Sequence, residues 1–410
     1  MKKITILLVL SLFYMSSVCA QASWEVKQSP VFEDLASVCF YDDDHGWVVS
    51  YTGTVLNTTD GGTTWNIHSF PDYHFESVHF PTASFGCIVG WFVESADSSL
   101  ILTTSDGGGT WTEATHTKVN RLNDVYFENS ADGWAVGTYD DLNLNCCLYT
   151  SDGGASWTKQ MEVLVSGAEL FGVHFRDEQV GTACGTDGAF LHTNSAGTTG
   201  WSLNISMPLV DLNALWNVGS QHGCAVGDEG TVLYTINDWY QHIDQTSGTT
   251  EDLYGVHAEP LNNKFWAVGN NGTIIHMSNY LLGWTSQASG TTEHLRDVCM
   301  LSETEGWAVG TNGTILHYTA ETSIVEFPNN IQLTITPNPS DGILKVMLDS
   351  GQFIDRIEVI DILGQVGMTI IPGELRQTCT VDLTELQNGI YFVKVYSSRG
   401  FALKRLIINS

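Results

Sequence analysis

The octet TTDGGTTW spans residues 58–65, and it returns as TSDGGGTW at 104–111 and as TSDGGASW at 150–157. In each copy an Asp that can accept hydrogen bonds from turn amides precedes two Gly residues, which readily adopt the left-handed backbone of tight turns. A recurring octet of this kind is either a set of equivalent binding sites or a turn within a repeated fold. The surrounding sequence decides between the two.

The octets belong to a longer unit that recurs seven times. A Gly-Trp-Ala-Val-Gly theme marks its middle, and a run of the Leu-x-x-Val-x-Phe type precedes each copy. Successive copies end 40 to 48 residues apart, which is the period of β-propeller blades. The copies are HGWVVS (45–50), FGCIVG (85–90), DGWAVG (132–137), VGTACG (180–185), HGCAVG (222–227), KFWAVG (264–269) and EGWAVG (305–310).

Each unit predicts four short strands. The apolar runs are rich in β-branched and aromatic residues and are bounded by Gly, Asn or Asp, and helical periodicity is absent. Turns such as NNG (270–272) and TNG (311–313) suit the hairpin between the second and third strands. The octet falls in the turn before the fourth strand.

We interpret the octet as a staple of that turn rather than as a binding site. The fourth copy, TNSAGTTGW (193–201), carries Ser195 where the Asp belongs, and the sixth, MSNYLLGW (277–284), has lost more of the pattern. The octet resembles the Asp-box of propellers in sialidases and sortilin-type receptors. The residues assigned to this structural role are Asp60, Gly62, Trp65, Asp106, Gly108, Trp111, Asp152, Gly154 and Trp157.

The seventh unit ends at GTILHYTAE (313–321) without a Trp-bearing fourth strand. The missing piece stands at the other end of the chain, where SWEVKQSP (23–30) is similar to TWTEA (110–114). We therefore expect residues 24–28 to supply the outer strand of blade 7, which closes the ring and removes an open sheet edge.

The repeats stop at the segment AETSIVEFPNN (320–330), and alternating short strands with turn signals follow, which predicts a sandwich of about seven strands. This region closely resembles the type A C-terminal sorting domain of type IX secretion cargo in Bacteroidetes. The resemblance implies recognition by that secretion machinery. It rests on Pro337-Asn338-Pro339, Gly342, Asp361, Gly364-Gln365, Gly389-Ile390-Tyr391, Lys404 and Arg405.

The fold class expected for the chain is all-β, a seven-bladed β-propeller followed by a small immunoglobulin-like β-sandwich. The first twenty residues have Lys2 and Lys3, an apolar run and small residues at the end, as a secretory signal peptide does. No other stretch is long and apolar enough for a transmembrane helix. The expected organisation is a signal peptide (1–20), a propeller closed by its N-terminal strand (21–320), a linker (321–332) and the sorting domain (333–410). A protein of this organisation passes through the periplasm and is secreted or held at the outer cell surface.

The formal charge of the chain is −30, and residues 21–330 hold seven Lys and Arg against 38 Asp and Glu. Such a surface disfavours nucleic acid and anionic lipid as partners, and either a solvated exterior or cationic ligands are compatible with it. The cysteine spacing fits no zinc pattern, so we expect neither metal nor cofactor, and buried free thiols are favoured over disulfides. Cys146 and Cys147 stay unassigned. His79, His174 and His257 occupy one repeated strand position, which favours packing between blades over metal binding.

The Trp-Ala-Val-Gly units, the first three octets and the segments SGTTEDL (247–253) and SGTTEHL (289–295) look like the photosystem II stability/assembly factor propeller family. The resemblance covers about 300 residues. It implies the propeller fold and a protein-binding platform, and we do not transfer the photosystem itself.

An enzymatic function stays open. A sialidase needs an arginine trio with a Tyr/Glu pair, and the propeller holds Arg121, Arg176 and Arg296 but no Arg-Ile-Pro signature. A xyloglucanase-type glycosidase needs two opposed carboxylates, which this acidic sequence does not exclude. The motifs of serine hydrolases, P-loop proteins and HExxH metalloproteases are absent. The sequence favours a secreted or surface recognition module, and a glycoside hydrolase using carboxylates on the funnel face is the alternative.

A ligand is expected on the face opposite the octets, where the positions flanking the first apolar residue of each unit vary among polar and aromatic types. Trp91 and Phe92 are assigned to a long loop on this face, as an aromatic anchor for a partner. The candidate ligand-binding residues are Asp34, His74, Trp91, Phe92, Arg121, Glu169, Asp211, Asp252, Tyr254, His294 and Arg296.

Overall fold

The computed structural model describes residues 23–320 and 333–409, except for 94, 115–118, 140–143, 161–167, 199, 205–206, 220, 260–262, 349–352, 361–365, 371, 373–375, 385 and 398–399. The expected signal peptide and linker lie outside the described residues, as do Asp361, Gly364 and Gln365 of the sorting motif. The chain divides into two compact units, Met1–Glu321 and Thr322–Ser410. Within the described residues no helix is long and apolar enough to cross a membrane.

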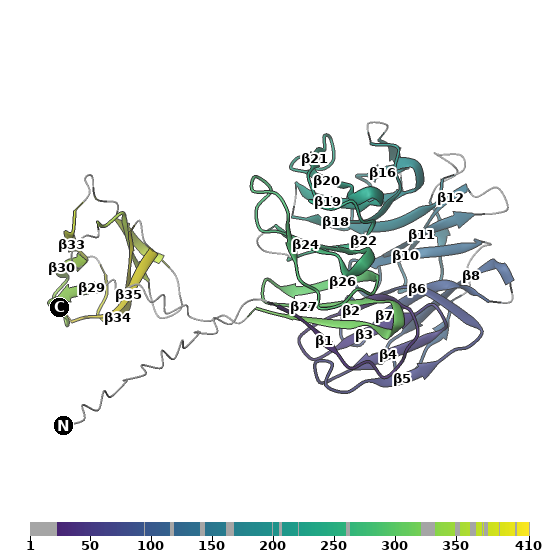
Figure 1. The fold of residues 1–410 in the computed structure, drawn as a ribbon, viewed down its shortest axis with the longest axis horizontal. Helices are drawn as coiled ribbons and strands as arrows, with labels where there is room; N and C mark the ends of the chain where they lie inside the picture. The colour runs from purple at the N-terminus through teal and green to yellow at the C-terminus, as the bar shows by residue number, and fades with distance from the viewer. Residues whose placement is uncertain are drawn as a thin grey trace, which may run out of the picture. The chain divides into compact units, whose positions relative to one another are not determined.

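The first unit consists of seven four-stranded antiparallel sheets that follow one another along the chain (Figure 1). Blade 1 has β2 (Leu35–Phe40), β3 (Gly46–Ser50), β4 (Thr54–Thr58) and β5 (Asn66–Ser69). Blade 2 has β6 (Tyr73–His79), β7 (Gly86–Phe92), β8 (Ser95–Thr104) and β9 (Thr112–Glu113), and blade 3 has β10 (Arg121–Phe127), β11 (Gly133–Tyr139), β12 (Leu144–Thr150) and β13 (Thr158–Lys159). Blade 4 has β14 (Leu170–Phe175), β15 (Gly181–Gly185), β16 (Phe190–Thr193) and β17 (Ser202–Leu203). Blade 5 has β18 (Leu212–Val218), β19 (His222–Gly227), β20 (Val232–Thr235) and β21 (Ile243–Gln245), and blade 6 has β22 (Leu253–Glu259), β23 (Lys264–Gly269), β24 (Ile274–Met277) and β25 (Thr285–Gln287).

Blade 7 combines the two ends of the propeller sequence. Its inner strands are β26 (Leu295–Ser302), β27 (Glu305–Gly310) and β28 (Ile315–Thr319), and β1 (Ser23–Lys27) pairs with β28 as the outer strand. Figure 1 shows purple β1 beside the green strands of this sheet. Trp24 is buried, and its indole N–H donates to Gln287 Oε1 at 2.9 Å. The N-terminal strand therefore occupies the place that the sequence comparison predicted for it.

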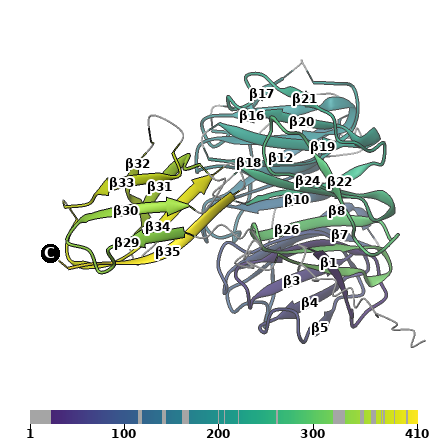
Figure 2. The same cartoon turned by 60° about the vertical axis from the view of Figure 1, so that its left-hand side comes forward.

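The second unit holds two sheets of the predicted sandwich (Figure 2). Their inner faces share one cluster of buried aliphatic side chains, among them Val346, Val359 and Val395. The sheets are β29-β30-β33 and β32-β31-β34-β35, with bounds β29 (Leu333–Thr336), β30 (Ile343–Leu348), β31 (Arg356–Ile360), β32 (Val366–Ile370), β33 (Thr378–Asp382), β34 (Gly389–Ser397) and β35 (Gly400–Ile408).

Stacked aromatic rings fill several of the seams between propeller blades. The indole of Trp47 stacks on Phe80 at 3.5 Å between ring centroids, and Trp134 stacks on Phe175 at 3.6 Å. Trp47 and Trp134 lie in the second strand of one blade, whereas Phe175 ends the first strand of the next blade and Phe80 directly follows such a strand. The repeated Trp and Phe positions of the sequence are therefore the contacts by which one blade packs on its neighbour.

Side chains of the innermost strands also accept backbone N–H groups across the seams. The histidines at the repeated position do so through Nδ1, with the amides of Phe127, Asn217 and Met300 donating to His79, His174 and His257 at 3.2, 3.3 and 3.3 Å. Burial lowers the pKa of His79 to about 4 and that of His257 to about 3, so the neutral acceptor form prevails at pH 7. The interpretation of these histidines as residues between blades is confirmed.

The described cysteines are free thiols, seven of them buried and Cys379 half-buried. Cys146 and Cys147 lie next to each other on β12 and enter different core clusters, because successive residues of a strand point to opposite faces. The pair that the sequence left unassigned is thus part of two packed cores.

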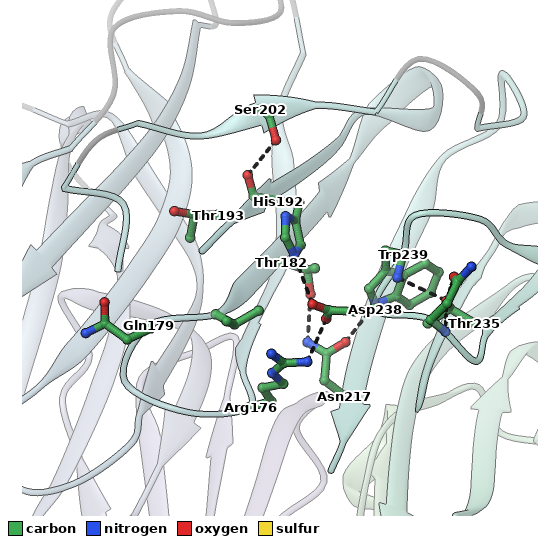
Figure 3. Close-up of polar contacts among 12 residues, drawn as sticks. Arg176, Gln179, Thr182, His192, Thr193, Ser202, Asn217, Thr235, Asp238 and Trp239 are labelled. Atoms are coloured by element: carbon green, nitrogen blue, oxygen red, sulfur yellow. Dashed lines mark hydrogen bonds and ion pairs between the residues drawn. The ribbon is translucent and has the colours of Figure 1, made fainter. Parts of the chain in front are cut away.

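The seam between blades 4 and 5 departs from the aromatic pattern, and a neighbouring turn compensates for it (Figure 3). Thr182 stands where Trp47 stands in blade 1, and Asn217 replaces the usual Phe. Trp239 takes the turn position of Gly62 with a left-handed φ of 62°, and its Nε1 donates to Asn217 Oδ1 at 2.7 Å. Asn217 Nδ2 in turn donates to Thr182 Oγ1 at 2.8 Å. The indole of the turn supplies the bulk that the strand lacks.

The octet turns have the hydrogen bonds of a staple. In blade 1, Asp60 Oδ1 accepts from Thr58 Oγ1 and from the Thr64 amide, both at 2.8 Å, and the Gly62 amide donates to Thr58 Oγ1 at 2.9 Å. Blades 2 and 3 repeat this set. The Thr110 amide and the other bonds to Asp106 lower the pKa of that carboxyl to about 2. These carboxylates are therefore occupied by their own turns.

Candidate functional site

The innermost strands of the seven blades surround a channel with a cavity of about 580 Å³. The two ends of this channel lie on different faces of the propeller. On one face, the octet turns form hydrogen bonds with the turns between the first and second strands of a blade; for example, the Gly61 amide donates to the Asp44 carbonyl at 3.0 Å. On the other face, the turns between blades contact the turns between second and third strands; for example, the Phe70 amide donates to the Gly53 carbonyl at 2.7 Å. We call this second side the mouth face.

The deep wall of the channel carries two carboxylates, Asp124 of blade 3 and Asp297 of blade 7. Asp297 accepts a hydrogen bond from Ser37 Oγ at 2.8 Å, and Asp124 accepts one from Ser77 Oγ at 2.7 Å. Both carboxylates also accept backbone amides of their own or an adjoining inner strand. Burial raises the pKa of Asp124 to about 7 and raises that of Asp297 as well. Because their acceptor capacity is used, these groups brace the ring.

One side of the mouth is built from blades 1, 2 and 3. The imidazole of His74 stacks on the Trp91 indole at 3.9 Å, and the guanidinium of Arg121 lies over the same indole at 4.8 Å. His74 Nε2 and Glu76 Oε1 are 3.0 Å apart, and Tyr51 packs on His74. Burial raises the pKa of Glu76, whereas the neighbouring His74 lowers it by a smaller amount.

The other side of the mouth comes from blades 3 to 7. The Arg296 guanidinium lies over the Tyr254 ring at 4.5 Å, and its Nε is shielded from water without an acceptor. Asn123 Nδ2 donates to Glu169 Oε1 at 3.0 Å, which ties blade 3 to blade 4. Phe171 completes this part of the lining.

Five of the candidate ligand-binding residues line the cavity: Trp91, Arg121, Glu169, Tyr254 and Arg296. His74 instead packs behind Trp91. Four others accept a backbone amide from the preceding blade, which leaves less of their capacity for a ligand. The amides of Asn312, Asp187, Glu229 and Asn271, all in left-handed turns, donate to Asp34, Asp211, Asp252 and His294 at 2.9, 2.8, 3.0 and 3.2 Å.

The prediction of a loop at Trp91 and Phe92 is wrong, because both residues belong to β7. Trp91 pairs with His74 and with Ser99, so the apolar stretch that follows the repeat extends the hairpin. Since neighbouring strand residues face opposite sides, Phe92 turns to the core and packs edge-on against Tyr73 at 5.3 Å.

Sequence reasoning also missed residues of this face. Tyr51 lines the cavity, although it occupies a turn position that holds Asn270 in blade 6. Phe32 and Leu209, in the turns that lead into blades 1 and 5, are 89% and 85% exposed. The equivalent positions in blades 6 and 7 are Thr250 and Thr292. The sequence signal that could have identified them is an apolar residue at a turn position that is polar in other blades.

Comparison with known proteins agrees with both parts of the chain. A family model described as photosynthesis system II assembly factor YCF48 matches residues 16–119, and one for the secretion system C-terminal sorting domain matches residues 334–409. The photosystem II assembly protein Ycf48 of Thermosynechococcus vestitus is 38% identical over 61 residues, which are 14% of this chain and 18% of that protein. The chloroplastic stability/assembly factor HCF136 of Oryza sativa subsp. japonica is 31% identical over 96 residues, 22% of this chain and 23% of that protein.

Two solved structures show the same fold. YCF48 from Cyanidioschyzon merolae covers 73% of this chain and 99% of its own, with a TM-score of 0.59 and 19% identity. A structure described as YCF48 bound to D1 peptide covers 73% and 97%, with a TM-score of 0.57 and 18% identity. The curated relatives are matched over only about a fifth of their length.

The architecture and its tail define a secreted β-propeller module. More particularly, the propeller resembles the photosystem II assembly factors over the first quarter of the chain, and its tail matches the secretion-system C-terminal sorting domain.

Proposed function

We propose that the propeller recognises a protein partner through its mouth face. The observation that carries this proposal is the pair of apolar turn tips, Phe32 and Leu209, on the face where the channel opens between Arg121 and Arg296. Exposed apolar side chains beside a polar pocket are typical of protein contact surfaces. A structure of a similar propeller is described as bound to a peptide, which favours the same class of ligand.

The test compares apolar tips on the two faces. Partners cross-linked to the intact chain at the cell surface are identified and quantified for the wild type and for a Phe32→Ser/Leu209→Ser variant. A matched control, Leu281→Ser/Leu282→Ser, removes side chains that are 76% and 79% exposed in the blade 6 octet turn. We expect the first variant to lose the partner and the control to retain it. Loss in the control alone would place recognition on the octet face.

We also propose that the chain enters the periplasm by the signal peptide of residues 1–20 and leaves it through the sorting domain. A chain truncated after Glu321 keeps the whole propeller unit but lacks the sorting unit. It is expected to accumulate, folded, in the periplasm. Arrival of this truncated protein in the medium or on the surface would show that the tail is not the export address.

A glycoside hydrolase is the second candidate, favoured by two carboxylates of the cavity. Burial raises the pKa of Glu76, as a general acid requires, and Glu169 lines the same cavity as a candidate base or nucleophile. The intact chain is assayed against sialosides and plant β-glucans beside Glu76→Gln. Turnover that disappears in the variant would establish the enzyme, and the absence of turnover on all substrates would remove this candidate.

A further inference from the structure

Asn57, on the third strand of blade 1, is a buried polar residue beside a cavity. The residue is 9% exposed, and its side-chain Oδ1 is shielded from water and has no hydrogen-bond partner in the described part of the chain. It lines a cavity of about 630 Å³ in the outer groove between blades 1 and 2. A buried carbonyl without a donor is costly, and a ligand in this cavity that brings a donor removes that cost.

The equivalent position has a side-chain partner in other blades. Tyr149 occupies it in blade 3 and His317 in blade 7, each paired with a residue of the second strand as Asn57 is. The Tyr149 hydroxyl donates to Asp132 at 2.7 Å, and His317 Nε2 pairs with Glu305 Oε1. Asn57 departs from this pattern, so the demands of the repeat do not account for its unpaired carbonyl.

The neighbours of Asn57 build a polar wall on one face of the blade 1 sheet. Trp47, Asn57 and Asn66 lie directly opposite one another on β3, β4 and β5, so their side chains share a face. This face is turned to blade 2, because Trp47 stacks on Phe80. His68 lies two residues after Asn66 on the same strand and therefore points the same way. These side chains of blade 1 all line the cavity.

The lining favours a neutral ligand with several hydroxyl groups. It contains no Lys or Arg among the described residues, and Asp106 forms part of it, which disfavours phosphates and carboxylates. The described residues also hold no group of three His, Cys, Asp or Glu that could bind a metal ion. A carboxamide offers both N–H donors and a carbonyl acceptor, and the adjacent hydroxyls of a sugar match that pair. The volume lies within the range of about 300–1,000 Å³ that is typical of small-molecule sites.

We propose that the outer groove between blades 1 and 2 binds a neutral saccharide, whose hydroxyl groups Asn57 and Asn66 hold while His68 contacts it from the same strand face. The groove is formed by the second to fourth strands of blade 1 and the octet turn of blade 2, away from the innermost strands that line the channel. A saccharide bound there leaves the mouth face open to a protein partner. This site is additional to the proposed function and does not depend on it.

The test measures binding to the intact chain by isothermal titration calorimetry. The probes are three neutral tetrasaccharides, namely cellotetraose, maltotetraose and chitotetraose. Trigalacturonate represents an acidic sugar, and an amidated peptide of Gly and Ser represents a neutral ligand that is not a sugar. The variants are Asn57→Leu, Asn66→Ala and His68→Ala. Thr112→Val is the matched control, because Thr112 faces Thr103 across β8 and β9 as Asn66 faces Asn57.

We expect at least one neutral tetrasaccharide to bind with a dissociation constant at or below about 1 mM. Asn57→Leu is expected to weaken this binding about tenfold or more, and Asn66→Ala and His68→Ala about fivefold each. Thr112→Val is expected to bind as the wild type does. Failure of all three tetrasaccharides to bind, binding of trigalacturonate or the peptide alone, or unchanged affinity in Asn57→Leu and Asn66→Ala would overturn the site.

Thermal melting separates a binding role of Asn57 from a structural one. Leu removes the unpartnered carbonyl, so Asn57→Leu is expected to melt at the temperature of the wild type or above it while it loses the saccharide. If Asn57→Leu fails to fold, Asn66→Ala decides the matter, because Asn66 is exposed and its removal leaves the core intact.

Two variants of the other face locate the saccharide. Glu76→Gln, in the channel, and Phe32→Ser/Leu209→Ser, at the mouth, are expected to bind the tetrasaccharide as the wild type does. Loss of binding in Glu76→Gln, with full binding in Asn66→Ala, would move the sugar to the channel and contradict the groove. Loss of the protein partner in Phe32→Ser/Leu209→Ser leaves the groove unaffected, so the two proposals fail independently.

Discussion

The two faces of the propeller are made by the same seven repeats, yet they end in opposite states of hydrogen bonding. On the octet face, each intact turn satisfies its own Asp, as Thr58 and Thr64 do for Asp60. On the mouth face, the guanidinium groups of Arg121 and Arg296 rest on aromatic rings and have no acceptor among the described residues. Repetition with satisfied polar groups indicates architecture, whereas variation with unpaired donors indicates recognition.

The largest expected effect tests the architectural side of this comparison. Trp24→Ala removes a side chain that is 6% exposed, contacts Tyr318 and donates to Gln287. We expect a loss of about 3–5 kcal/mol in the free energy of unfolding of the propeller, measured by denaturant titration. Val26→Ala on the same strand, at a position 51% exposed, is the control. An unchanged transition for Trp24→Ala would mean that β1 does not hold the ring closed.

The histidines of the channel give the next effect, which depends on pH. Burial lowers the pKa of His257 from 6.5 to about 3, so the unfolded state binds the proton first as pH falls. The stability that neutral His257 contributes is therefore complete above pH 6.5 and is lost as the pH falls towards 3. His257→Asn keeps an acceptor but does not titrate. The difference in unfolding free energy between wild type and variant is expected to shrink by up to about 4 kcal/mol over that window, and a constant difference would contradict the assignment.

A smaller effect is expected from the staple itself. Thr104→Val keeps the shape of a buried side chain but removes the hydroxyl that accepts the Gly108 amide at 2.9 Å and donates to Asp106. We expect a loss of about 1–2 kcal/mol in unfolding free energy and unchanged partner binding. Thr110→Val, at the exposed end of the same turn, is the comparison. Weakened partner binding without loss of stability would reverse the roles of the two faces.

The smallest expected effect on stability belongs to the mouth. Among the described residues neither Arg121 nor Arg296 forms an ion pair that a Gln would remove, so the free energy of unfolding of Arg121→Gln and of Arg296→Gln is expected to change by less than about 0.5 kcal/mol. Thermal melting of both variants beside the wild type measures this. A large destabilisation would show that these arginines hold the blades together, as the octet residues do.

The sequence was sufficient for the features that repeat. The repeat period predicted the number of blades, and the Asp of each octet predicted a hydrogen-bonded turn. The absence of a Trp-bearing fourth strand in blade 7 pointed to residues 24–28 as its outer strand. Each of these predictions depends on a local sequence pattern or on its absence. The mouth was less accessible, because its contacts join residues far apart along the chain. Nothing near Asp34 reveals that it accepts the amide of Asn312.

The same limit explains the error at Trp91 and why the packing of the blade 4–5 seam was not foreseen. Trp91 was assigned to a loop because the repeat had ended, although its β-strand propensity and its pairing with His74 extend the hairpin. Trp239 takes a left-handed position that normally favours Gly, since tertiary contact with Asn217 outweighs the local preference. In both places a cross-strand or cross-blade partner decided the outcome.

The central claim is that recognition lies on the mouth face and not on the octet face. The most direct test is the dissociation constant of the cross-linked partner for two variants of the intact chain. One is Trp91→Ala/Arg121→Glu/Arg296→Glu, and the other is Asp60→Asn/Asp106→Asn. We predict that the first variant loses the partner while the second binds it as the wild type does. Unchanged affinity in the mouth variant, with loss in the octet variant, would contradict the account.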